Sequence, residues 1–127
     1  MANAVTVAPG SGFTGATAVL NSAATDKAGF VTFTTSTTIP GSGPYLLCTL
    51  TFSGSWADTY SIPPVVIAYP SANPFNSRTA SQEAAAAALG PFFVILNSNL
   101  TQAAVYCTSA PSESTAYDIG YAAIQGP

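Results

Sequence analysis

The segment from Tyr45 to Phe52, "YLLCTLTF", shows the clearest period of two in this chain. Apolar side chains alternate with threonines over most of its length. The apolar positions are Leu46, Cys48, Leu50 and Phe52. Because successive side chains of a strand point to opposite faces, this alternation predicts a half-buried strand whose apolar face lies inward.

Further short runs of strand-forming residues lie on both sides of this segment, with Gly, Pro, Ser and Asn between them. We expect strands at 4–8, 15–21, 29–37, 63–70, 91–97, 99–109 and 115–125. Many short strands separated by turn residues are typical of an antiparallel β-sandwich or barrel. The sequence therefore predicts an all-β fold, and we favour a sandwich.

Two of these runs carry specific expectations about burial. The run 63–70, "PPVVIAYP", is apolar throughout, which is typical of a central strand covered on both faces. In the run 115–125, Tyr117, Ile119 and Tyr121 share one face. Asp118 lies on the opposite face, so we expect it to point outward.

One stretch differs from the strands around it. The segment 81–90, "SQEAAAAALG", contains five consecutive alanines, which are strong helix formers. Ser81 is a candidate N-cap, and Gly90 followed by Pro91 would end a helix. We expect one short helical segment near 81–89 inside a single domain, because similar strands flank it.

The composition limits the classes of partner. The 127 residues carry a net charge of −3, and only 6% of them are charged. With Lys27 and Arg78 as the only basic residues, the chain lacks the basic surface that binding to nucleic acid or to an anionic membrane requires. Two interpretations fit so few charges: a chain that covers its surface with copies of itself or with a larger assembly, or a secreted domain with a neutral, Ser/Thr-rich surface.

Cys48 and Cys107 lie in apolar, strand-like runs, and we expect buried free thiols, with a single bridge between them as the alternative. The N-terminal segment lacks the features of a signal peptide, so we expect synthesis and assembly in a cytoplasm.

No set of catalytic residues stands out. The chain has no histidine, which removes the common forms of Ser-His-Asp and Cys-His activation and most zinc sites. Its five acidic residues are scattered, and four of them fall in turn-like segments. We expect no enzyme activity, no cofactor and no metal.

Aromatic side chains are the remaining candidates for contacts, because they close cores, anchor interfaces and bind sugars. The candidates are Trp56, Tyr60, Tyr69, Phe75 and Tyr106. Closure of the core, a subunit interface and glycan contact all remain open for them.

The order of these segments resembles the small β-sandwich domains of tailed-bacteriophage virion proteins, over about residues 20 to 125. The matching features are Asp26-Lys27-Ala28-Gly29 before a Thr-rich strand, "TLTF", "PPVVIAYPSAN", the alanine segment and the terminal "YDIGY". The resemblance implies a jelly-roll-like, trimeric structural protein of the virion without catalytic activity. The alanine run lies between the strands expected at 63–70 and 91–97, and its small side chains permit another backbone to approach closely. We therefore expect Ala85 and Ala88 to lie at a cap of the sandwich or at a contact near the trimer axis.

Within that family, we expect a capsid decoration (cement) protein that stabilises the shell, with residues 1–14 as an arm docking on the particle and 15–127 as one sandwich domain. The expected partners are further copies in a homotrimer, the major capsid protein and other virion proteins. The alternative is the receptor-binding tip of a tail or head fibre that recognises a host glycan or surface protein.

Overall fold

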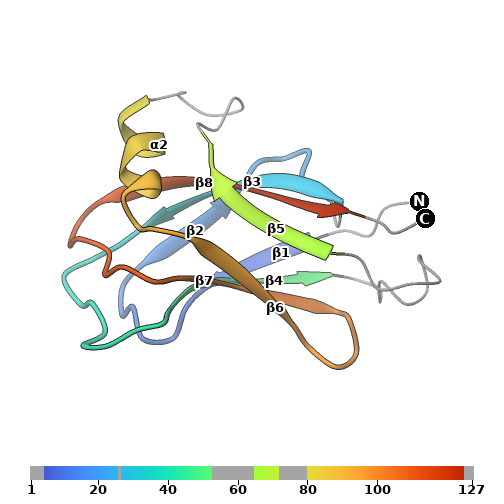
Figure 1. The fold of residues 1–127 in the computed structure, drawn as a ribbon, viewed down its shortest axis with the longest axis horizontal. Coiled ribbons are helices and arrows are strands. Elements are labelled where there is room, and N and C mark those ends of the chain that lie inside the picture. Colours follow the sequence, from blue (N-terminus) through green and yellow to red (C-terminus); the bar gives the residue numbers. More distant parts are fainter. Residues whose placement is uncertain (1–4, 26, 53–64, 72–79, 125–127) are drawn as a thin grey trace.

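Two antiparallel four-stranded sheets pack face to face, with one short helix at an end of the sandwich (Figure 1). The computed structural model describes residues 5–25, 27–52, 65–71 and 80–124. The elements are β1 Val5–Pro9, β2 Thr17–Leu20, β3 Ala28–Thr34, β4 Tyr45–Phe52, β5 Val65–Pro70, α2 Ala80–Ala87, β6 Phe92–Leu96, β7 Gln102–Cys107 and β8 Ala116–Ile124. The expected all-β sandwich is confirmed, and the described residues contain the short helical segment that was expected near 81–89.

The strand order decides which strands have free edges. One sheet has the order β1-β4-β7-β6, and we call it sheet A; the other, sheet B, has the order β2-β3-β8-β5. Strand β1 lies next to β2 on one side of the sandwich, and β5 lies next to β6 on the other. The four edge strands therefore form two pairs, one on each side.

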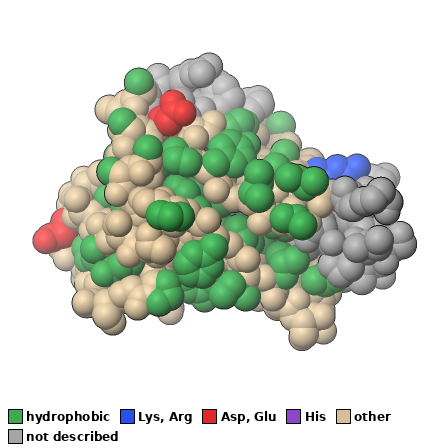
Figure 2. All heavy atoms as spheres, viewed as in Figure 1, with side chains coloured by type: hydrophobic (Ala, Val, Ile, Leu, Met, Phe, Trp, Pro, Cys, Tyr) green, Lys and Arg blue, Asp and Glu red, His purple; other side chains and the backbone are tan. Residues whose placement is uncertain are grey.

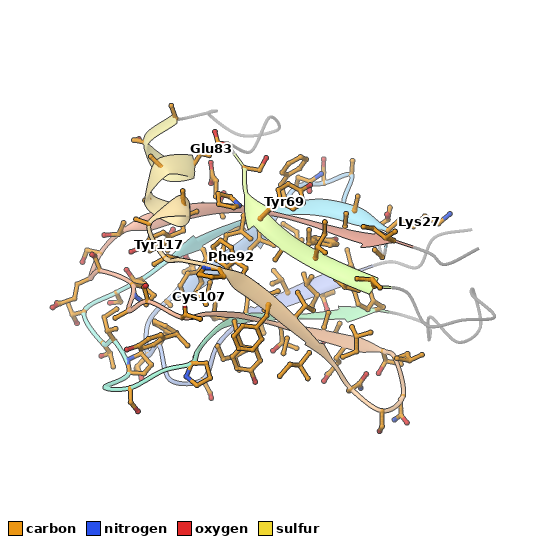
Figure 3. All side chains as sticks on the ribbon, in the orientation of Figure 1. Lys27, Tyr69, Glu83, Phe92, Cys107 and Tyr117 are labelled. Atoms are coloured by element: carbon orange, nitrogen blue, oxygen red, sulfur yellow. The ribbon has the colours of Figure 1, made fainter. Side chains whose placement is uncertain are left out.

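The core lies between the inner faces of the two sheets. Cys48, Leu50 and Phe52 of β4 pack in one cluster with Val31 of β3 and Tyr121 of β8. At the helix end of the sandwich a second cluster contains Phe92, Cys107 and Tyr117, which lie between the sheets (Figure 3). The inward faces expected for Tyr117, Ile119 and Tyr121 are confirmed, because all three are buried.

The first residues of β4 depart from the simple alternation of inward and outward side chains. Leu46 pairs with Tyr106 and Cys48 pairs with Val105, so the register shifts across Leu47. At such a bulge two residues oppose one on the partner strand, and the face of the side chains changes. Leu47 is fully buried in the core instead of Leu46, which is only half-buried. The prediction of an inward Leu46 is therefore wrong.

The described N-terminal residues belong to the sandwich, and the strand expected at 4–8 is present as β1. Val5–Pro9 pairs with β4 along its whole length, from Val5 opposite Phe52 to Pro9 opposite Cys48. Phe13 is buried and meets Phe33 edge-on, with 5.2 Å between ring centroids. The described part of the segment 1–14 is thus an edge strand and a core contact, because Val5 and Val7 pack on the core cluster between the sheets. Docking of this segment on a particle stays a prediction.

We therefore expect Gly10→Ala to lower the free energy of unfolding by at least about 2 kcal/mol. The Gly10 amide donates to Leu47 O at 2.8 Å, and a Cβ at this position would overlap the Leu46 carbonyl oxygen, which the bulge holds in place. Gly41→Ala is the matched control, because nothing lies within 4 Å of a Cβ there. Urea denaturation of both variants measures the difference; equal stabilities would show that the close approach at Gly10 is not required.

Strand β5 contradicts the expectation of a central strand. The run 63–70 was expected to be covered on both faces, but among the described strands Val65–Pro70 pairs with β8 alone and lies at the edge of sheet B. Val66 and Ala68 pack on the core, whereas Val65 and Ile67 are exposed. Pattern alone reports that a strand is apolar on both faces; it does not report what covers the second face.

Helix α2 lies beside the part of β8 that β5 leaves unpaired. Strand β5 pairs with β8 only from Ile119 to Ile124, and α2 contacts both strands at the end of the sheet (Figure 1). The helix buries Ala86, and Leu89 follows it into the core. It begins at Ala80, so Ser81 is not its N-cap, and it is followed by Gly90 at φ +81°, as the stop signal predicted.

Candidate functional site

Four of the seven predicted contact residues lie in the described part of the chain. Trp56, Tyr60 and Phe75 fall outside the described residues, so these predictions stay open. Tyr69 and Tyr106 lie on the outer faces of sheets B and A respectively, and Ala85 and Ala88 lie on or directly after α2.

The ring of Tyr69 lies on the outer face of sheet B, in the space left by a glycine on the neighbouring strand. It lies opposite Gly120 in the β5–β8 register, and a Cβ at Gly120 would come within 2.5 Å of the Tyr69 ring. An aromatic side chain covering a neighbouring glycine is a common way to fill a sheet surface. Tyr69 is therefore half-buried and serves packing as well as any contact.

Tyr106 forms an aromatic pair on the outer face of sheet A. Its ring stacks on Phe93 of β6, with 5.1 Å between centroids and 6° between planes. Phe93 was not singled out from the sequence, because the run 91–97 gives no sign of which of its apolar side chains face outward. The pair forms a flat aromatic surface, since Phe93 is 37% exposed.

The two alanines have different surroundings. Ala85 is half-buried against the core cluster at the helix end of the sandwich. Ala88 is exposed in the single chain. Of the alanines from 84 to 88, Ala86 is the one that is fully buried. A contact near an oligomer axis stays a prediction for both.

Exposed large apolar side chains gather where β5 and β6 lie next to each other, on the face shown in Figure 2. Each exposes between 37% and 63% of its surface. We call this set the edge patch: Val65 and Ile67 of β5, Phe93 and Ile95 of β6, and Ile124 of β8, which lies opposite Val65. Among the described residues, the only other large apolar side chain with comparable exposure is Val19 of β2.

The described strands contain almost no charged residues. Sheet A has no charged residue in any of its four strands, and sheet B has only Asp118. Asp118 was expected to point to solvent, but it is 1% exposed. The outer faces of the strands in the described structure therefore present no charge to solvent.

Asp118 is buried because α2 lies beside β8 at this point. Thr32 Oγ1 donates to Asp118 Oδ1 at 2.8 Å. With the Gln82 amide oriented to satisfy both of its polar atoms, its nitrogen donates to Oδ1 at 2.9 Å and to Oδ2 at 3.2 Å. A buried carboxylate needs such partners, so these bonds tie the helix to the sheet.

We expect Asp118→Ala to lower the free energy of unfolding by about 2 to 3 kcal/mol, because the Thr32 hydroxyl and the Gln82 amide would lose a charged acceptor at a buried position. Glu113→Ala is the control, since Glu113 lies in an exposed loop and should change stability by less than about 0.5 kcal/mol. Thermal and urea unfolding give both values. If the two variants are equally stable, Asp118 does not hold α2 in place.

Both cysteines are free and buried, which confirms the expectation of unpaired thiols. Burial raises the pKa of the Cys48 thiol from 9.0 to about 12 and that of Cys107 to about 11. The Cys107 thiol also donates to Ser109 O at 3.3 Å. Because the thiolate is the nucleophile, neither group is activated for covalent chemistry near neutral pH.

These raised pKa values predict a loss of stability in alkali. A folded thiol whose pKa is raised stabilises the fold fully below pH 9, and this contribution declines as pH rises toward 12, because the unfolded thiol ionises first. For Cys48 the slope approaches about 1.4 kcal/mol per pH unit.

Urea unfolding of the wild type and of Cys48→Ala from pH 7 to 11 tests this prediction. Near neutral pH, we expect the variant to have a lower free energy of unfolding than the wild type. Above pH 9, its free energy of unfolding should fall less steeply with pH. All other ionisable groups are the same in both proteins, so their contributions cancel in the comparison. Parallel curves would contradict the assignment.

The described residues contain no group of three His, Cys, Asp or Glu side chains that could hold a metal, and no pocket opens among them. No helix in the same ranges has the length and apolarity to cross a bilayer. Comparison with protein-family models, curated proteins and solved structures gave no match for this chain. The edge patch and the uncharged outer faces are thus the features from which a function can be argued.

Proposed function

We propose that this chain is a structural virion protein of a tailed bacteriophage, and that it acts as a capsid decoration protein that stabilises the shell through subunit contacts. One observation carries the proposal: the eight described strands expose no charged side chain on either outer face of the sandwich. Soluble domains usually interrupt such faces with charges, so these faces suit a protein whose surface is covered by neighbours.

The physical basis of the proposed activity is surface burial. Apolar and neutral side chains stabilise a contact in proportion to the area that they remove from water, and no buried charge has to be compensated. A protein that binds only the assembled shell stabilises that state by mass action. The proposed partners are further copies of the chain, with three per assembly, and the major capsid protein.

The choice of a virion comes from the resemblance of the sequence around Asp26-Lys27-Ala28-Gly29, "TLTF" and "YDIGY" to phage virion domains. The alternative within that class is the receptor-binding tip of a fibre. The stacked pair of Phe93 and Tyr106 favours this second candidate, because a flat aromatic surface can bind the apolar face of a sugar ring.

The position of the protein in purified particles separates the two. For a decoration protein, we expect cryo-EM of virions to show density for this sandwich repeated over the capsid lattice. Particles assembled without the protein should lose infectivity at a temperature several degrees lower than complete particles, because the shell contacts are missing.

Density confined to fibre tips, together with blocking of adsorption by the purified chain, would overturn the decoration role in favour of receptor binding. Loss of that blocking in Tyr106→Ala, with retention in Glu113→Ala, would assign the binding to the aromatic pair. Absence of the chain from virions would reject both candidates.

A further inference from the structure

The two sides of this sandwich differ in a way that the fold does not require. On the side formed by β1 and β2, the outward positions are Thr6, Ala8, Thr17 and Val19. On the side formed by β5 and β6, the outward positions are Val65, Ile67, Tyr69, Phe93 and Ile95. Five of the six exposed large apolar residues in the described chain belong to the edge patch, and only Val19 lies on the opposite side.

The backbone edges of these strands do not distinguish the two sides. Proteins protect edge strands by making them very short, or with proline, charge or bulges. Both β1 and β5 end in proline, at Pro9 and Pro70, and β2 has only four residues. None of the four edge strands carries a charge or a register shift. The difference between the two sides of the described sandwich therefore lies in their outward side chains.

We propose that the edge patch is the surface on which a second copy of this chain docks. The continuous apolar runs of β5 and β6 have the composition of strands buried on both faces, although in the single chain only their inner faces are covered. A second molecule placed on the patch supplies the missing cover. This proposal concerns the chain alone and does not depend on a role in a virion.

The chemistry of the patch selects a copy as the occupant. It contains no charged side chain, and the described charges at Lys27 and Glu113 lie in loops while Glu83 lies on α2. A membrane surface or a nucleic acid would need basic residues on the patch. The same patch on another copy is equally apolar and uncharged, so two patches meet without burying an unpaired charge or opposing like charges.

Two arrangements bury these residues. Related by a twofold axis, two copies would place the same patch face to face. In a closed ring, β5 of one copy would lie against β6 of the next, and a ring of three copies would be the trimer that the sequence resemblance implies. Either way, Ile67 at the middle of β5 and Ile95 of β6 become buried, and Val19 stays exposed.

Sedimentation velocity of the full chain over a range of concentrations tests the proposal. We expect the wild type to form a closed oligomer, and Ile67→Lys and Ile95→Lys to weaken its association by about 100-fold or more, because each copy would bury a charge in the contact. Val19→Lys is the matched control: Val19 and Ile95 are both 53% exposed on outer faces of edge strands. It should leave the association constant unchanged.

A milder pair guards against loss of folding. Val65→Thr and Val19→Thr make the same nearly isosteric change on the two sides of the sandwich, and circular dichroism and thermal unfolding check that both variants fold. Only Val65→Thr should weaken association, by several-fold. A wild type that stays monomeric at about 100 µM, a concentration well above typical specific dissociation constants, would overturn the proposal, as would an oligomer that the β5 and β6 variants leave intact or that the Val19 variants disrupt equally.

Discussion

The packing of β4 against β3 and β8 across the middle of the sandwich is the contact on which the rest of this structure depends. Leu50 and Phe52 pack there with Val31 and Tyr121. Strand β7 also contributes to this cluster, so its four strands, β4, β7, β3 and β8, are the inner strands of the two sheets. Tyr121 also fixes the start of β3: its hydroxyl donates to Thr25 O at 2.6 Å, and its ring occupies the space that a side chain at position 29 would need. The edge strands are then added to this centre, each covering one side of the core.

The helix solves a local problem that this arrangement creates. Because β5 ends opposite Ile119, no strand of the described ranges lies beside the first residues of β8 on that side, and a buried carboxylate at Asp118 requires donors. Helix α2 fills the position with Ala86 and brings the Gln82 amide to Asp118. Small side chains suit this place, since they allow the helix to approach the sheet closely. The only charged residue of the described strands is thereby removed from the surface.

The outer surface of the described strands is also uncharged, and part of it is apolar. Exposed apolar surface on a single chain has a free-energy cost that is recovered when another surface covers it. Here that surface is not spread evenly, because the side of β1 and β2 carries mainly threonine and alanine at its outward positions, whereas the side of β5 and β6 carries valine, isoleucine and phenylalanine. This asymmetry within one sandwich is what connects the fold to assembly, both in the proposed contact between copies and in the proposed role in a virion.

The sequence by itself determined the all-β class, the inward faces of β4 beyond its bulge and of β8, and the presence of a short helix that ends before Gly90, because alternation and helix propensity are local properties of the chain. The order of strands is not local. Only the tertiary structure placed β5 at an edge, moved Leu47 instead of Leu46 into the core, included Val5–Pro9 in sheet A, and buried Asp118 beside α2. For the candidate site, the sequence picked out Tyr69 and Tyr106 but not Phe93 or Ile95. An apolar run shows that both faces of a strand avoid water, and pairing across the whole chain decides which face is left for a partner.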